Sequence, residues 1–497
     1  VAIGRSALQT QNFTTATNAY NVGVGYAAGG NVSTGIQNTL IGGLAGDAFS
    51  DADYNVAVGS QALSTDTLGS RSTAVGQNAL FTQNFTTATD ADNTAVGMSA
   101  GAAITTGIRN TLIGTIAGDA LTDADFNVAV GRAALSTDTL GSCSIAIGRN
   151  ALIVQNFTTA TDSFNVAVGD RAGAAVTTGT SNTLIGGLSG DALTTGSNNV
   201  AVGGFALSSD DLGSQSVAIG TSALENQNSA TAVTTYNTAV GYGAGIAVTT
   251  GTSNTFVGHR AGDGTDDGVR NVAVGTGALS ANCTNDNTAI GEGALGITVG
   301  GNNTAVGRSA GASINSGSNN VCIGLETDGA HDTASSITIG VGITGATNDF
   351  SFGKPSNVVK CDFDADATFE RNSDVRLKTN IADASLGLDF VNNLRPVTYK
   401  WKASADLDAS DAQLAHLRRQ DEDGNIINDM TTDVTMHGFI AQEVKTALDT
   451  AGVSTFKGWD VDRHGVQTIS REMYVIPLVK AVQELSTALD AALARIA

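Results

Sequence analysis

The first 353 residues contain no lysine, no proline and no tryptophan, although all three occur in the remainder of the chain. The first lysine is Lys354. All three prolines and both tryptophans follow it, namely Pro355, Pro396, Pro477, Trp401 and Trp459. The earlier part is instead rich in Gly, Ala, Thr, Asn and Val. A change in composition this abrupt predicts a boundary between a repetitive region and a globular domain near residue 350.

Positive charge is scarce as well. The 25 Lys and Arg residues stand against 47 Asp and Glu residues, so the net charge is -22. Binding to nucleic-acid phosphates or to an anionic membrane surface requires clustered basic side chains. We therefore expect no nucleic-acid partner and no docking on a membrane surface.

Cysteine is rare, and no two of the four cysteines are spaced as a metal or redox pair: Cys143, Cys283, Cys322 and Cys361. Cys322 replaces a small residue inside a repeat, which predicts a buried side chain. No apolar run has the length needed to cross a membrane, and no signal peptide is visible. We expect no disulfide framework and no membrane insertion.

A short motif recurs twenty times in the first 340 residues. It reads Asn or Ser, any residue, Ala or Leu, Val or Ile, then Gly, as in residues 55–59 and 303–307. Its glycines follow one another mostly at 16 or 17 residues, with four gaps of 21. Gly4, Gly76 and Gly148 are 72 residues apart, so four motifs form a larger unit.

The four longer gaps contain inserted residues. The segment Gln11–Thr17 recurs unchanged at Gln83–Thr89 and at Gln155–Thr161. An insertion that returns at the same place in each larger unit predicts loops on one side of a stack of coils.

The period explains why a stack should form. Each motif provides a short β-strand with β-branched alternation, and its glycine permits a sharp turn. One coil cannot bury a core, but stacked coils can, with strands pairing at about 4.8 Å. The recurring Asn predicts a ladder of stacked side chains. Because the core residues are small and only 5% of the chain is aromatic, we expect three chains to pack around one axis.

These motifs resemble the head repeats of trimeric autotransporter adhesins, which form parallel β-rolls, and similar repeats in phage tail fibres. The resemblance covers residues 1–340 and implies a trimeric parallel β-roll or β-solenoid shaft. The simplest interpretation of this shaft is a spacer. The alternative is that the insertions, or turns such as Asp47 and Asp51–Asp53, bind a receptor or calcium. Calcium needs six to eight oxygen ligands and these turns offer few, so we expect no metal and no cofactor.

The repeat fades over residues 341–372. This segment contains four aromatic side chains, namely Phe350, Phe352, Phe363 and Phe369. Short strand and turn patterns persist here, so we predict a neck with a small aromatic core.

Four further motifs follow in the last part of the chain. They occupy residues 373–381 (Ser-Asp-Val-Arg-Leu-Lys-Thr-Asn-Ile), 394–401, 437–444 and 474–485. Together, and in this order, they resemble the intramolecular chaperone domain of phage tail spikes and fibres such as endosialidases. The resemblance covers residues 373–497 and implies a smaller α+β domain.

The same resemblance implies one chemical step. Domains of this family cut themselves just before the serine of the first motif, using a Ser-Lys dyad. The scissile bond would join Asn372 to Ser373, with Ser373 as the nucleophile and Lys378 as the general base. A serine needs a base to remove its proton, and a lysine is a base when burial or a nearby cation lowers its pKa. Arg376 is close in sequence, and a backbone N–H is the expected oxyanion donor.

Simpler interpretations exist for these residues. An isolated Ser and Lys at this spacing would more often be a capped turn and a solvated charge, but the three accompanying motifs favour the catalytic interpretation. His437 has no Ser-His-Asp arrangement around it, so we do not expect it to be catalytic.

The last twenty residues favour a helix. Pro477 suits a first-turn position. Apolar residues follow at alternating spacings of four and three, namely Leu478, Val482, Leu485, Leu489, Ala492 and Ile496. This spacing is typical of a coiled-coil seam, and three strands would match the shaft.

The sequence thus predicts a mainly β protein with a shaft (1–340), a neck (341–372) and an auto-processing chaperone domain (373–497) that ends in a coiled-coil helix. The predicted function is a subunit of a trimeric virus fibre for host attachment, cutting only its own chain. Expected partners are two further copies, a host-cell surface receptor or glycan, and other virion proteins through a missing N-terminal region. The expected location is the virion, after synthesis in the host cytoplasm.

Two other functions compete with this prediction. The main alternative is a trimeric bacterial surface adhesin. A polysaccharide-degrading tailspike would need paired carboxylates in a cleft, and the regular coils leave no obvious insertion for one.

Overall fold

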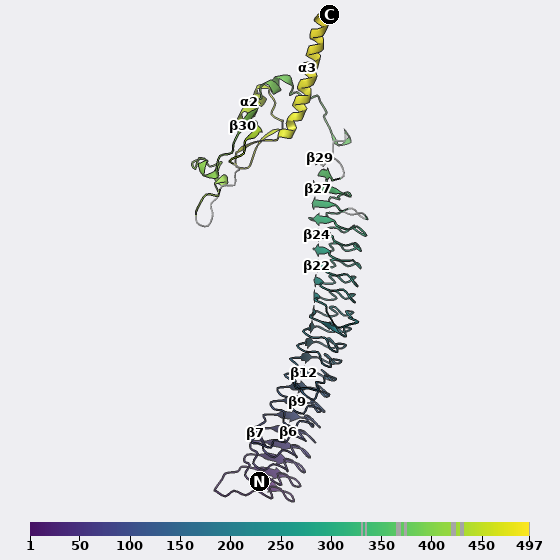
Figure 1. Cartoon of the computed structure of the whole chain (residues 1–497), viewed down its shortest axis with the longest axis vertical. Coiled ribbons are helices and arrows are strands. Elements are labelled where there is room, and N and C mark those ends of the chain that lie inside the picture. Colours follow the sequence, from purple (N-terminus) through teal and green to yellow (C-terminus); the bar gives the residue numbers. More distant parts are fainter. Residues whose placement is uncertain are drawn as a thin grey trace. The chain divides into compact units, whose positions relative to one another are not determined.

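The computed structural model describes residues 1–329, 332, 335–363, 369–371, 375–418, 424–427 and 432–496. The chain divides into two compact units, Val1–Asn372 and Ser373–Ala497. In Figure 1 the first unit is a stack of short strands, and the second combines helices with short strands.

The first unit is a parallel β-solenoid, which confirms the fold expected from the repeat. Each motif forms one short strand, and each strand pairs in register with that of the next coil, as Val56 does with Thr73. The strands of this sheet are β1 (Ala2–Ile3), β2 (Val22–Val24), β3 (Thr39–Ile41), β4 (Val56–Val58), β6 (Thr73–Val75), β8 (Thr94–Val96), β9 (Thr111–Ile113), β10 (Val128–Val130), β12 (Ile145–Ile147), β14 (Val166–Val168), β15 (Thr183–Ile185), β16 (Val200–Val202), β18 (Val217–Ile219), β20 (Thr238–Val240), β21 (Thr255–Val257), β22 (Val272–Val274), β23 (Thr288–Ile290), β24 (Thr304–Val306), β25 (Val321–Ile323), β26 (Ile337–Gly340) and β27 (Asp349–Lys354).

Small side chains fill the inside of every coil. The middle residue of each full strand is buried, as Ala57 is, and so are the Ala and Leu of the following turn, such as Ala62 and Leu63. These residues form one continuous hydrophobic core that reaches from Ala28 to Cys322. The buried state predicted for Cys322 is confirmed. Stacking therefore gives a single chain the core that one coil lacks.

Both the backbone conformation and the close approach of the next coil require glycine at the last position of the motif. At Gly42 the φ angle is 135°, a region that side chains rarely adopt. A Cβ at this position would also lie 2.5 Å from the carbonyl oxygen of Gly59 in the next coil. The glycine column thus allows neighbouring coils to approach closely.

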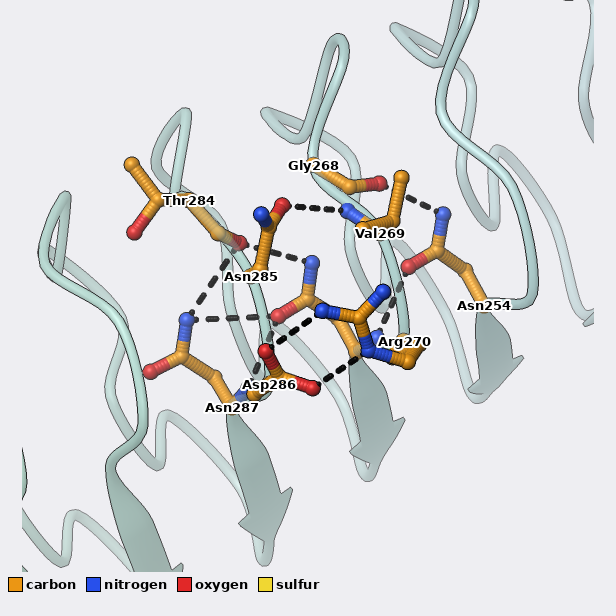
Figure 2. Close-up of polar contacts among 9 residues, drawn as sticks. Asn254, Gly268, Val269, Arg270, Thr284, Asn285, Asp286 and Asn287 are labelled. Atoms are coloured by element: carbon orange, nitrogen blue, oxygen red, sulfur yellow. Dashed lines mark hydrogen bonds and ion pairs between the residues drawn. The ribbon is translucent and has the colours of Figure 1, made fainter.

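Buried asparagines connect successive coils. Figure 2 shows that Asn254 Nδ2 donates to the carbonyl oxygen of Gly268 at 2.8 Å. Its Oδ1 accepts a hydrogen bond from the backbone N–H of Asn271, also at 2.8 Å. The expected asparagine ladder is therefore present, but most of its bonds join a side chain to a neighbouring backbone. An amide can do this because it is both donor and acceptor.

Every fourth coil of the larger units has serine in place of this asparagine. At Ser72 the missing amide is supplied by Gln83, the first residue of the insertion. Gln83 Nε2 donates to Asp66 Oδ2 at 2.6 Å and to Ser72 Oγ at 3.1 Å. Its Oε1 accepts from Asn93 Nδ2 at 2.9 Å. The insertion thus completes the ladder, and the same arrangement recurs with Gln155.

The insertions contain short strands as well as loops. Three additional parallel pairs form beside them: β5 (Gly69–Ser70) with β7 (Thr89–Asp90), β11 (Gly141–Ser142) with β13 (Thr161–Asp162), and β17 (Gly213–Ser214) with β19 (Val233–Thr234). The inserted residues are therefore fixed to the preceding coil by backbone hydrogen bonds.

The sheet continues past the last motif into the expected neck. Strand β26 pairs in parallel with β27, and an antiparallel extension follows through β28 (Asn357–Asp362) and β29 (Phe369–Arg371). The predicted aromatic core is wrong: Phe352 is 37% exposed and Phe363 is 53% exposed. Phe350 and Phe352 take the two outward strand positions around the buried Ser351, and the side chain of Phe369 lies outside the described residues.

The second unit is smaller and mixes helices with strands, as expected. Its elements are η1 (Val375–Leu377), α1 (Leu388–Asn392), β30 (Val397–Tyr399), η2 (Ser404–Asp406), η3 (Ala415–Leu417), β31 (Met436–Gly438), α2 (Ala441–Thr450), β32 (Trp459–Val461), β33 (Gln467–Ile469), η4 (Arg471–Tyr474) and α3 (Val475–Ile496). Its core contains Leu386, Phe390, Val444, Leu448 and Tyr474. The terminal helix predicted from the apolar spacing is confirmed as α3. Within the described part of the chain, no helix combines the length and apolarity that a membrane span requires.

Candidate functional site

The candidate site is the predicted self-cleavage point. Asn372 and Ser373 lie outside the described residues. The first compact unit ends at Asn372 and the second begins at Ser373. The predicted scissile bond therefore coincides with the boundary between the two units.

Lys378, the predicted base, follows directly after η1. Its backbone N–H donates to the carbonyl oxygen of Val375 at 3.1 Å, which closes the short helix. The side chains of Lys378 and Arg376 are exposed. The single chain thus presents this lysine at the surface of the second unit.

The second and third sequence motifs form one substructure. Strands β30 and β31 pair antiparallel, with Val397 opposite Gly438. Next to this pair, Arg395 forms two hydrogen bonds with the carboxylate of Glu443, one of them from Nε at 3.1 Å. The Arg395 hydrogen bond lowers the pKa of Glu443 below its ordinary value. The spacing of the motifs did not reveal this ion pair, because its partners are 48 residues apart.

His437 sits in β31 opposite Thr398, with an exposed side chain. Among the residues that the structure describes, no serine or aspartate side chain forms a hydrogen bond with it. The structure therefore places no catalytic triad around this histidine.

The fourth motif contacts helix α1 through Glu484. Its Oε2 accepts a hydrogen bond at 2.7 Å from the backbone N–H of Leu388, the first residue of α1. A Cβ on Gly387 would lie 2.3 Å from the same oxygen, so a larger residue there would displace the Glu484 carboxylate from this position. A carboxylate at a helix N-terminus pairs with a backbone N–H that the helix itself cannot satisfy.

Tyr474 lies at the centre of the aromatic core. Its ring centroid is 5.3 Å from that of Phe439 in the third motif and 5.4 Å from that of Phe456. Its hydroxyl donates to the carbonyl oxygen of Gly458 at 3.2 Å. Burial raises the pKa of Tyr474 to about 12. The second, third and fourth motifs therefore build one scaffold, and the first motif, which contains Ser373 and Lys378, precedes it in the chain.

Potential metal ligands and cysteines are the other groups that could supply chemistry. Within the described ranges, no group of three His, Cys, Asp or Glu side chains is arranged to hold a metal ion. All four cysteines are free, and burial raises the pKa of the Cys322 thiol to about 12.

Comparison with known proteins identifies the C-terminal region. Residues 373–453 match the family described as the chaperone of endosialidase. The match begins at Ser373, includes the first three motifs and ends before α3. No curated protein and no solved structure matches the chain. The match and the solenoid of about 20 turns together fit a phage tailspike or tail fibre with a C-terminal chaperone.

Proposed function

We propose that this chain is a subunit of a homotrimeric phage tail fibre that attaches to a host cell, and that its C-terminal unit drives trimerisation and then cleaves itself off between Asn372 and Ser373. One observation carries the proposal: the family match and the second compact unit both begin at Ser373. A cut at this bond would release the whole chaperone unit and leave the whole shaft.

The outward face of the solenoid sheet supports assembly into a trimer. The first and third residues of each full-length strand flank the buried middle residue, and they are mostly Val, Ile or Thr, as in β15 and β18. Ile185 and Ile219 are each 39% exposed. Because the strands pair in register, these side chains form one apolar band along the unit. A long exposed apolar surface marks an interaction site, and two further copies would cover it.

Helix α3 supports the same conclusion. Of its 22 residues it buries only Pro477 and Ala481. Leu478, Leu485 and Leu489 are 52%, 56% and 58% exposed. These leucines occupy the seam predicted from sequence, and a coiled coil with two further copies would bury them. Association would also stabilise a helix whose apolar face is otherwise solvated.

Assembly would activate the cleavage chemistry. A lysine acts as a base in its neutral form, which burial favours, and Lys378 is exposed in the single chain. We propose that neighbouring copies cover it in the trimer. Lys378 then takes the proton of Ser373 Oγ, and the oxygen attacks the carbonyl carbon of Asn372. The C–N bond breaks, the Ser373 amine takes up a proton, and water hydrolyses the resulting ester.

This order of events would serve the folding of the shaft. Parallel coils depend on long-range pairing and expose strand edges until the stack is complete. A C-terminal unit that gathers three chains sets their register and raises their effective concentration. Its removal after assembly leaves a shaft that is stable kinetically, because the trimerising unit is no longer attached.

The test uses three variants of the full chain, analysed by mass spectrometry after expression. Wild-type protein should yield a fragment beginning at Ser373. Ser373→Ala and Lys378→Ala should remain whole, whereas Lys402→Ala, which removes another exposed lysine of the same unit, should be processed normally. Normal processing of both dyad variants would refute the assignment of the nucleophile and the base.

A further inference from the structure

A hollow of about 860 Å³ opens on the shaft beside the fourth insertion. Polar side chains from successive coils line it, among them Asn226, Asn228, Thr249, Asp266 and Asn282. The amides of Asn226, Asn228 and Asn282 are on exposed residues. The hollow therefore offers hydrogen-bonding groups at several levels along the stack.

Two substitutions relative to the earlier repeat units change the insertion at this place. The aromatic residues Phe85 and Phe157 are buried in the second and third insertions. The equivalent residue of the fourth insertion, 72 positions further on, is Ser229. The second substitution is at the position of Thr82 in the second insertion. The equivalent residue of the fourth insertion, 144 positions further on, is Asn226. The fourth insertion has thus lost bulk and gained an amide.

The hydrogen bonds of these equivalent residues differ too. The hydroxyl of Thr82 donates to the carbonyl oxygens of Ala102 and Ile104, at 2.8 and 2.9 Å. The described residues form no such bond with the side chain of Asn226. The amide of Asn226 is therefore available to a ligand, whereas the hydroxyl of Thr82 connects neighbouring coils.

A third difference lies two coils further along. Thr122 and Thr194 are 72 residues apart, and the next equivalent residue is Asp266. Thr122 Oγ1 donates to the carbonyl oxygen of Thr139 at 3.0 Å, a bond that a carboxylate cannot make. Asp266 Oδ1 instead accepts a hydrogen bond from the hydroxyl of Thr249. No donor to Asp266 Oδ2 occurs among the described residues, so this oxygen can accept from a ligand.

A close approach of two coils shapes the floor of the hollow. Gly264 lines it, and a Cβ there would lie 2.1 Å from the carbonyl oxygen of Ser280 in the following coil. The equivalent residues in the second and third units are Ala120 and Ala192. Glycine thus removes a side chain from the surface at a point where two coils approach each other closely.

The chemistry of the lining selects one class of ligand. No described residue of the lining is basic or aromatic, so neither an anionic ligand nor a peptide with a large apolar anchor finds its usual partner. Amide, hydroxyl and carboxylate groups repeat at the strand spacing, about 4.8 Å. A chain of sugars presents hydroxyl donors and acceptors at repeated intervals, and it fits such a row.

We propose that this hollow binds an uncharged oligosaccharide of the host surface. Asp266 Oδ2 accepts hydrogen bonds from sugar hydroxyls, and Asn226 and Asn228 donate to and accept from neighbouring hydroxyls. Asn282 Oδ1 accepts the backbone N–H of Asp266 at 3.1 Å, so Asn282 contributes its Nδ2 as a donor. The inference rests on the proposed attachment function and names the ligand class and its site.

The test measures binding of the trimer obtained by expressing the full-length chain to a printed array of neutral hexose and N-acetylhexosamine oligosaccharides. Sialylated and uronic-acid chains form the acidic arm, and unbranched peptides form the peptide arm. Wild-type protein should bind neutral chains, and Asp266→Thr and Asn228→Ala should each weaken that binding about tenfold or more, the loss of one good hydrogen bond. Threonine occupies the position of Asp266 in two other units, so the fold should tolerate the change.

Asn84→Ala is the matched control, because Asn84 is an exposed residue at the equivalent position of the second insertion. It should leave binding unchanged. Binding confined to the acidic or peptide arm, or Asp266→Thr protein that binds like wild type, would overturn the inference. Processing and native mass are measured on the same preparation. A processed trimer that binds no neutral chain contradicts this inference alone, whereas unprocessed protein that binds neutral chains through Asp266 supports it and contradicts self-cleavage.

Discussion

The shaft buries many of its polar groups, whereas the C-terminal unit keeps its main ion pair at the surface. Asn254 and Asp66 are fully buried in the shaft, but the side chains of Arg395 and Glu443 are 63% and 39% exposed. The cores differ as well, because the shaft packs mainly Ala and Leu, with Phe49 and Phe256 as its aromatic members, and the C-terminal unit packs aromatic rings around Tyr474.

This difference bears on how each unit folds. A buried amide is satisfied only when the neighbouring coil is in the correct register, so shaft stability depends on the order of the whole stack. The C-terminal unit instead has an aromatic core of its own, which joins α1, α2 and η4. A unit with a separate core, attached to a register-dependent stack, suits a chaperone that assembles first, and the following experiments test that comparison.

The largest effect is expected in the terminal helix. Leu485→Glu combined with Leu489→Glu places two charges in the proposed seam and should abolish trimer formation. Ala491→Glu adds a charge on the opposite side of α3 and should leave the trimer intact. Native mass spectrometry distinguishes the two results, and a trimer that survives the double change would remove α3 from the interface.

Removing one asparagine of the ladder should have the next largest effect, a loss of shaft stability. Asn254→Ala leaves the backbone N–H of Asn271 and the carbonyl of Gly268 without their partners. Each of the two buried unpaired groups costs about 1–3 kcal/mol, so the free energy of unfolding should fall by about 2–6 kcal/mol. Denaturant unfolding followed by far-ultraviolet circular dichroism measures the loss. Asn31→Ala, which removes an exposed amide, should change it little, and equal effects would contradict the ladder's role.

Acid should affect the two units in opposite directions. In the shaft, burial raises the pKa of Asp66 and Asp210 above the ordinary 3.8. Their stabilising contribution is complete below pH 3.8 and is lost as the pH rises through the raised values, so acidification from neutral pH should stabilise the shaft.

In the C-terminal unit the shift has the other sign. Hydrogen bonds from Arg395 and Ser410 lower the pKa of Glu443 and Asp408 from 4.5 and 3.8. Their contribution is present above those values and is lost as the pH falls through the lowered ones. In uncleaved Ser373→Ala protein, tryptophan fluorescence reports only on this unit, since both tryptophans follow residue 400, and circular dichroism reports mainly on the shaft. Parallel shifts of the two signals with pH would contradict the comparison.

Removing the surface ion pair of Arg395 and Glu443 should have the smallest effect on stability. Arg395→Ala should leave the denaturation midpoint of the C-terminal unit nearly unchanged, because exposed ion pairs contribute little to stability. Tryptophan fluorescence again provides the measurement. A shift of the midpoint as large as the one expected from Asn254→Ala in the shaft would show that the pair supports the scaffold more than its exposure suggests.

The sequence predicted the parts of the fold that repeat. The spacing of the motif glycines indicated stacked coils, and the burial of Cys322 followed from its place in the motif. The replacement of an asparagine by Ser72 and Gln83 was not predicted, because the two residues meet only after the insertion folds back on its coil. The prediction of an aromatic core in the neck was wrong for a related reason. The aromatic content indicated a core, but the alternation of side chains along the strand turns Phe352 outward.

The candidate site was less accessible to sequence reasoning. The order of the four motifs indicated the C-terminal family, and the match to residues 373–453 agrees with it. The ion pair of Arg395 with Glu443 and the contact of Glu484 with Leu388 join distant segments, and neither has a local signature. Lys378, the proposed base, is exposed in the single chain, so its proposed chemistry depends on an assembly that one sequence does not describe.

The most direct test of self-cleavage in an assembled trimer is the intact and native mass of purified wild-type protein. The account predicts a trimer of chains that end at Asn372, together with a separate fragment that begins at Ser373. A full-length chain that stays uncut in a stable trimer, or a cut at another bond, would contradict it.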